Sequence, residues 1–224
     1  MIEELAKLVP DLKQPGRVFY SGRMAFSGRA TSLYVLGLNP GGDPRYERET
    51  IAQHNQRVLD DSAPDDWSAY RDECWGEGDG EPGKATMQKR VLHLLEQVGY
   101  PERRVGRVPA SNLVFVRSSE EADIRGNFEE LARRCWRFHD RVIKALNPRV
   151  ILCFGKTCGG FVRRKLNANT LRKDFREKNG RRWKSQWFES DSGRAVVVVT
   201  HPSRANWVNP RTDPSGLVRE ALGK

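Results

Sequence analysis

The chain has 224 residues, which suits one α/β domain and hardly allows two. Its 39 Lys and Arg against 29 Asp and Glu give a net charge of +10, which favours a polyanionic partner, although many basic proteins use such a charge only to stay in solution. A hydrophobic fraction of 38% excludes global disorder. The apolar runs are far shorter than the roughly 20 residues that span a bilayer, and residues 1–13 lack a signal-type stretch. We therefore expect a cytoplasmic monomer with no membrane partner, associated with the nucleoid if the source is a bacterium.

Short apolar segments alternate with amphipathic segments along the chain. The strands expected in chain order are residues 33–38, 110–116, 149–155 and 195–200, and residues 183–190 are expected to form a hairpin with the last of these. The expected helices are residues 84–100, 128–146, 156–166 and 213–224. Residues 43–83, with an acidic tip at 77–83, are polar and broken by Pro and Gly, and we interpret them as a mobile insertion in a single domain spanning 1–224. The basic stretch 163–184 is interpreted as a solvated helical face, with phosphate contact as a second option.

This alternation predicts an α/β fold in which helices cover a parallel sheet. Ligands of such sheets bind beyond the carboxyl ends of the strands. The residues that follow each strand should then share one cleft, and they include Asn39, Asn112, Lys156 and His201.

The residues gathered there are amides and one imidazole. No Gly-Lys-Ser/Thr follows the loop GLNPGG, no Gly-x-Gly-x-x-Gly is present in it, and no histidines or acids have metal-ligand spacing, so phosphate-loop, dinucleotide and metal chemistry lack support. A pocket of this kind suits a planar, hydrogen-bonding ligand such as a nucleobase. Asn39 alone is more typical of a turn residue, and His201 alone is more often structural.

Four short blocks in order resemble the uracil-DNA glycosylase superfamily. They are GLNPG at 37–41, SNLVFVR at 111–117, the helix containing Cys135 with NPRVILCFGKTCG at 147–159, and HPS at 201–203. The first block is similar to that of the mismatch-specific and single-strand-selective branches. The resemblance implies a three-layer α/β/α sandwich with a central four-stranded parallel sheet. It also implies a monofunctional DNA glycosylase that flips a damaged base out of DNA and leaves an abasic site in base excision repair.

The resemblance also implies roles for individual residues. Asn39 would position the attacking water, and His201 would hydrogen-bond O2 of the departing base as a neutral imidazole. The base would contact Gly37, Leu38, Pro40 and Asn112, and Asn112 would pair with its edge. The aromatic residue that stacks on the base is Tyr70 or Trp75.

DNA contacts are expected on both sides of this pocket. They involve backbone amides of Gly41, Gly42 and Ser203 and the side chain of Lys156. Arg204 or Trp207 would take the place of the leucine that the family inserts into the base stack. The thermophile-type branch carries an iron–sulfur cluster, but only Cys135 matches one of its ligands here, so we expect no cofactor and no metal.

Two rival functions remain open. One is a catalytically silent DNA- or nucleotide-binding module of the same fold, and the other is a nucleotide hydrolase or transferase that uses the glycine loop. Uracil, hypoxanthine, xanthine and thymine opposite guanine are all candidate bases, in single- or double-stranded DNA.

Overall fold

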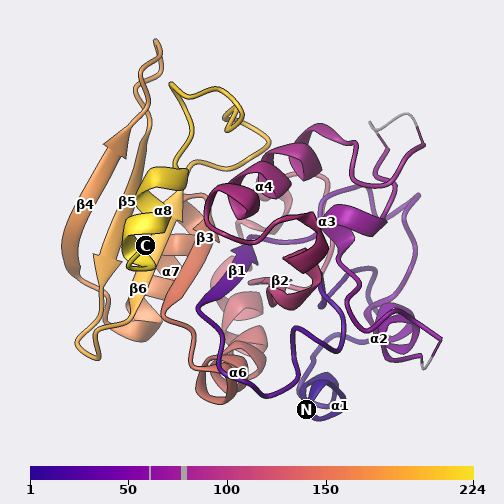
Figure 1. Cartoon of the computed structure of the whole chain (residues 1–224). Helices are drawn as coiled ribbons and strands as arrows, with labels where there is room; N and C mark the ends of the chain where they lie inside the picture. The colour runs from indigo at the N-terminus through magenta and orange to yellow at the C-terminus, as the bar shows by residue number, and fades with distance from the viewer. Residues whose placement is uncertain (61, 77–79) are drawn as a thin grey trace.

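A computed structural model describes residues 1–60, 62–76 and 80–224 and shows an α/β fold built on a six-stranded mixed sheet (Figure 1). The strand order is β2-β1-β3-β6-β5-β4. The strands are β1 (Leu33–Gly37), β2 (Ala110–Asn112), β3 (Val150–Phe154), β4 (Thr170–Arg176), β5 (Lys184–Glu189) and β6 (Ala195–Val199). Four of them, β2, β1, β3 and β6, are parallel neighbours, whereas β5 and β4 continue the sheet antiparallel.

Helices pack on both faces of this sheet. The helical elements are α1 (Ile2–Ala6), α2 (Ile51–Leu59), α3 (Ala69–Asp72), α4 (Thr86–Gln97), the 3₁₀ turn η1 (Glu102–Arg107), α5 (Glu121–Ile124), α6 (Phe128–Leu146), α7 (Lys156–Leu166) and α8 (Ser215–Ala221). Alternate residues of a strand point to opposite faces. Thus Tyr34 and Leu36 of β1 join a core with α1, α2, α6 and α7, while Leu33 and Val35 join a core with α3, α4 and α8. β1, β3 and β6 are buried along their whole length.

The expected four-stranded parallel sheet is therefore only part of the sheet. The predicted hairpin between 183–190 and 195–200 is present as β5 and β6, and a further strand, β4, pairs with β5. The interpretation of 163–184 as a helical face is wrong beyond Leu166, where α7 ends and the chain turns into β4. β4 has almost no buried side chains and is rich in Lys and Arg, as is typical of an edge strand protected against further pairing.

The segment 43–83 contains helices that its composition did not indicate. Thr50 caps α2 in a reciprocal pair with Gln53, in which each residue accepts a hydrogen bond from the backbone N–H of the other. Isolated bridges join Thr50 to Pro15 and Ser68 to Ser21, so the segment is fastened to the N-terminal region. Its mobility stays a prediction, and residues 77–79 of the acidic tip lie outside the described residues.

The parallel strands all end at one edge of the sheet. Gly37 of β1 is in register with Asn112 of β2, and Phe154 of β3 is in register with Val199 of β6. In the part of the chain that the structure describes, no helix has the length and apolarity needed to cross a membrane.

Candidate active site at the carboxyl edge of the sheet

The sheet places the predicted residues in a fixed order along one edge. Asn112 ends β2, Asn39 follows β1, Gly155 follows β3 and His201 follows β6. Since β3 lies between β1 and β6, the strands that carry Asn39 and His201 are two spacings apart, about 10 Å. Gly155 has a left-handed φ of 87°, and a Cβ placed on it would lie 3.9 Å from His201 Cβ. The gap between Asn39 and His201 is therefore bordered by a residue without a side chain.

His201 is held as a neutral ring with one free donor. Its Nδ1 accepts the backbone N–H of Ser203 at 3.2 Å, and the Ser203 hydroxyl lies 2.8 Å from the same nitrogen. The ring proton must then sit on Nε2, which has no hydrogen-bond partner among the described residues. Burial, against the opposing carboxylate of Glu121 and with a smaller contribution from the charge of Arg204, lowers the pKa of His201 from 6.5 to about 4. At neutral pH the imidazole is an uncharged donor.

Asn39 is fixed by both protons of its amide. Its Nδ2 donates to Pro40 O at 2.9 Å and to Ser118 Oγ at 2.8 Å. The Ser118 hydroxyl in turn donates to Glu120 O at 2.8 Å. The group that remains on Asn39 is Oδ1, which is an acceptor and has no partner among the residues described.

The segment 118–121 runs along the edge from Asn39 toward His201. Ser118 contacts Asn39 at one end, and at the other end Glu121 accepts a hydrogen bond from Thr157 at the start of α7, at 2.6 Å. The charge of Glu121 also reaches His201. This segment therefore connects the two sides of the site.

Asn112 is buried with one amide group unused. The residue is 5% exposed, and its Nδ2 has no hydrogen bond of good geometry, although the Tyr20 hydroxyl lies close enough for Asn112 to lower the pKa of Tyr20. A Cβ on Gly37 would lie 2.0 Å from Asn112 Oδ1, so the amide occupies the space that only glycine leaves at this position. A buried donor without a partner is rare and marks a place where a ligand can complete the bonding.

Three aromatic rings pack beside β2. Tyr70 and Trp75, the two candidates for base stacking, are 5.6 Å apart between ring centroids, and Tyr20 lies 5.8 Å and 6.2 Å from them. Tyr70 is only 2% exposed, whereas Trp75 is half-buried, so Trp75 has the more accessible ring. Burial raises the pKa of Tyr20, against the opposing effects of Arg17, Arg117 and Asn112, which places the Tyr20 hydroxyl among these groups.

Tyr20 is a third aromatic residue at this place, in addition to the two stacking candidates predicted from the sequence. A bridge between Phe19 and Ser111 brings the segment around Tyr20 alongside β2. The apolar run Val18–Phe19–Tyr20 between Gly16 and Gly22 is the available signal, because it indicates a short extended segment.

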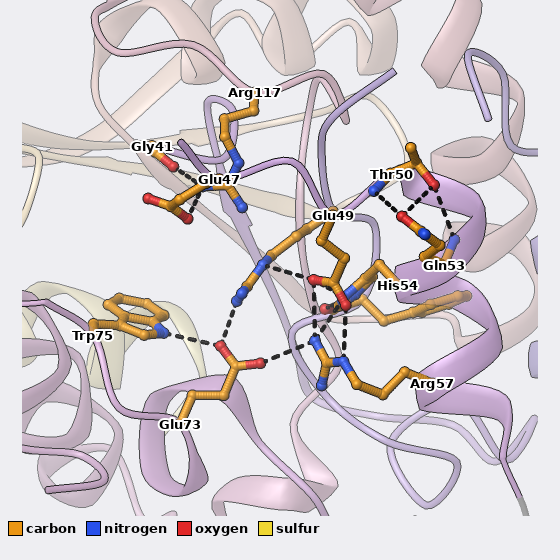
Figure 2. Close-up of polar contacts among 12 residues, drawn as sticks. Gly41, Glu47, Glu49, Thr50, Gln53, His54, Arg57, Glu73, Trp75 and Arg117 are labelled. Atoms are coloured by element: carbon orange, nitrogen blue, oxygen red, sulfur yellow. Dashed lines mark hydrogen bonds and ion pairs between the residues drawn. The ribbon is translucent and has the colours of Figure 1, made fainter. Parts of the chain in front are cut away.

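Trp75 is anchored by a network of charges (Figure 2). Its indole Nε1 donates to Glu73 at 3.0 Å, and Glu73 also binds Arg57 at 3.4 Å and Arg17. Arg57 reaches Glu49 at 2.9 Å, so Glu49 and Glu73 are linked through arginine. These ion pairs fix the position of the Glu73 carboxylate, to which the Trp75 indole is hydrogen-bonded. Their residues lie outside the four sequence blocks that resemble the superfamily.

The glycine loop after Asn39 is closed by a buried arginine. Arg117 donates to Gly41 O and pairs with Glu47 at 2.6 Å (Figure 2). Gly42 has a φ of 100°, and a Cβ there would lie 1.9 Å from Glu47 Oε1. Because a carboxylate sits against Gly42, this part of the loop is poorly suited to the phosphate contact expected for it.

The other residues expected to contact DNA differ in their exposure to solvent. Lys156, Ser203 and Arg204 are exposed, but the backbone N–H of Ser203 is occupied by His201 and is not available for a phosphate. Trp207 has no exposed surface and packs 5.4 Å from Phe154 between ring centroids. Its assignment as a wedge is wrong because its ring belongs to the core, and Arg204 remains as the candidate.

The chain matches no protein-family model and none of the curated proteins compared with it.

Proposed function

We propose that the protein is a monofunctional DNA glycosylase that hydrolyses the N-glycosidic bond of uracil or a related deaminated base in DNA. In this reaction the bond between C1′ and the base nitrogen breaks, and its electron pair leaves with the base. Water adds to C1′ and loses a proton to solvent water, and the departing base anion takes up a proton from solvent. The products are the free base and an abasic site.

The observation that carries the proposal is the state of His201. A donor aimed at an atom that becomes anionic helps the transition state more than the ground state, and one such donor is worth about 3 kcal/mol. Nε2–H of His201 meets this requirement because Ser203 occupies Nδ1 and burial keeps the ring neutral. A charged imidazolium would bind anions generally, whereas a neutral donor favours the oxygen of a leaving base.

Asn39 and Asn112 supply complementary functions. Asn39 Oδ1 can accept a hydrogen bond from the attacking water, but an amide does not take up its proton, so turnover is expected to be slow. The unused Nδ2 of Asn112 suits O4 of uracil, and its Oδ1 suits N3–H. Trp75 is the preferred stacking ring.

The finer architecture is part of the same proposal. The four parallel strands would correspond to the central sheet of the three-layer α/β/α superfamily fold, and β4 and β5 would be an addition at its edge.

Release of base from labelled oligonucleotides, detected by alkaline cleavage at the abasic site, tests the proposal. The panel contains uracil, hypoxanthine, xanthine and mismatched thymine, each in single and double strands. Asn39→Ala and His201→Ala should each strongly reduce release, and Asn169→Ala, which changes an exposed asparagine at the β4 end of the sheet, is the matched control. No release of any of these bases by the unaltered protein would defeat the proposal.

A catalytically silent DNA-binding module is the second candidate. It is favoured by the burial of Trp207, which removes one wedge candidate, and by two described cavities that include neither Asn39 nor His201 in their linings. It predicts salt-dependent DNA binding that neither alanine substitution changes.

A further inference from the structure

A basic cavity of about 500 Å³ lies next to the His201 loop. It is open to solvent and is lined by the tip of the β4–β5 hairpin and by residues 204–212, with one residue from α4. The charged residues in its lining are Arg90, Lys178, Arg181, Arg204 and Arg211. Its volume is in the range that holds a nucleotide-sized group.

The sheet register places this cavity at the same edge as the candidate active site. β5 runs antiparallel to β6, and Ser185 near its start accepts the backbone N–H of Thr200 at 3.2 Å. The β4–β5 tip therefore projects beyond the carboxyl end of β6, beside the loop that follows it (Figure 1). Arg90 donates to Pro202 O at 2.6 Å and Arg181 donates to Arg204 O at 3.1 Å, so both arginines contact the loop that begins at His201.

The cavity is built by backbone and amide hydrogen bonds. Asn179 Oδ1 accepts the backbone N–H groups of Arg181 and Arg182, both at 3.0 Å, and shapes the tip. Lys178 N donates to Arg211 O at 2.8 Å and fastens the tip to the loop. The cations are thus held together by the fold, on three segments that are distant in sequence: α4, the β4–β5 tip and residues 204–212.

The five cations of this cavity are not paired with carboxylates in the described part of the chain, residues 1–60, 62–76 and 80–224. Glu177, the buried carboxylate at the tip, accepts a hydrogen bond from Asn179 at 2.7 Å and pairs with none of the five cations. A second cavity of about 630 Å³ near Asn39 differs, because its Arg45, Arg117 and Arg134 pair with Asp43, Glu47 and Asp11. Unpaired guanidinium groups gathered in one hollow are suited to phosphate oxygens.

We propose that this cavity binds backbone phosphates of the DNA strand that carries the target base, beside the nucleotide held at His201. The inference rests on the proposed function and extends it to a strand-binding subsite at one end of the active site. The phosphates would lie against Lys178, Arg181 and Arg211, and the Arg204 side chain would stand between them and the pocket.

The salt dependence of binding tests the proposal. Binding of a fluorescein-labelled single-stranded oligonucleotide is measured by anisotropy over a series of salt concentrations for the unaltered protein and for Lys178→Gln/Arg211→Gln. Removal of one phosphate-binding cation should reduce the slope of log K against log salt by roughly 0.7, so the slope of the double variant should be smaller by roughly 1.4. Both side chains are exposed, and thermal unfolding verifies that the variant is folded.

Arg133→Gln/Arg137→Gln is the matched control. These two arginines are also exposed, and they lie on α6, which packs on the sheet face opposite α4. The control removes the same charge and should leave the slope unchanged. An unchanged slope in the cavity variant, or an equal reduction in both variants, would overturn the proposal.

Two further arms separate the outcomes. Competition by deoxyadenosine triphosphate tests whether free nucleotide is the occupant: the proposal is overturned if the cavity variant loses nucleotide binding but keeps the oligonucleotide slope. Base release at saturating substrate tests the proposed function by itself. Binding with the predicted slope change but without base release would contradict the glycosylase, whereas base release with an unchanged slope would contradict only the subsite.

Discussion

Ser203 donates its backbone N–H to Nδ1 of His201 at 3.2 Å and thereby assigns the ring proton to Nε2. The strand β6 delivers both residues, because its buried valines fix where the chain leaves the sheet. The loop turns back on His201, where the backbone N–H of Arg204 donates to His201 O at 2.9 Å and the Ser203 hydroxyl lies 2.8 Å from Nδ1. The hydrogen bond from the Ser203 backbone makes His201 a neutral hydrogen-bond donor, with its proton on Nε2 and its ring in a fixed position.

The pH profile of base release should show no loss between pH 8 and about pH 5. Since the pKa of His201 is lowered to about 4 by burial, the active neutral ring persists well below the usual value of 6.5, and release should fall only as the pH drops through about 4. Single-turnover rates across this range test the prediction. A decline centred near 6.5 that disappears in His201→Gln would show that the ring titrates normally and contradict the assignment.

His139 should make folding stability depend on pH. It is buried in α6, where Tyr34 donates to its Nδ1 at 2.8 Å and its Nε2–H donates to Leu113 O at 3.2 Å. Burial lowers its pKa to about 4, so the unfolded chain binds a proton between pH 6.5 and 4 that the folded chain does not. The stabilisation is complete above pH 6.5 and decreases by about 3 kcal/mol as the pH falls to 4.

Urea unfolding at several pH values measures this effect. A variant with His139→Gln should show a flatter dependence between pH 6.5 and 4, although it starts from a lower stability. An identical dependence in the variant would assign the pH effect to other groups, including His201.

Gly37→Ala should damage base recognition. A Cβ at this position would displace the Asn112 amide, with a stability cost of about 1–3 kcal/mol and a loss of base release of roughly tenfold or more. Gly216→Ala is the matched control, since Gly216 lies in α8 outside the site and a Cβ on it has no heavy atom within 4 Å. Equal effects of the two substitutions on base release would show that Asn112 has no special part in it.

Substitution of Trp207 should lower the stability of the protein, whereas substitution of Arg204 should lower its activity. Trp207→Ala removes a fully buried ring and should destabilise the protein by about 3–5 kcal/mol. Arg204→Ala changes an exposed residue and should leave stability within about 0.5 kcal/mol but slow release from double-stranded DNA. Unfolding curves and release rates for both variants test this, and an Arg204→Ala protein that is as fast as the parent on double strands would exclude the wedge role.

The strands that carry the site were predictable because they are buried. Leu33–Gly37, Val150–Phe154 and Ala195–Val199 are continuous apolar runs that end at Gly, Asn or Pro, and the helix Phe128–Leu146 ends at Asn147, whose φ of 43° is left-handed. The first and last residues of such strands and helices can therefore be predicted from their own sequence. Their order along the chain then predicts which loops share the carboxyl edge.

The features that the sequence did not predict are stabilised by contacts with other segments of the chain. β4 has the exposed, charged composition of a loop and is a strand only because β5 offers a free edge. The place of Tyr20 beside Tyr70 and the ion pair of Arg17 with Glu73 depend on contacts between segments that are 50 or more residues apart. The capping box of Thr50 and Gln53 was a readable local signal for α2 within a segment whose composition indicated a loop.

Single-turnover release of uracil by the unaltered protein, Asn39→Ala, His201→Ala and the double variant tests the central claim most directly, namely that one amide and one neutral imidazole act on the same everted base. The account predicts measurable release by the parent, a loss of roughly 100- to 1,000-fold for His201→Ala, and a severe loss for Asn39→Ala. Release that survives both substitutions at the parental rate, or a parent that releases no uracil, would contradict it.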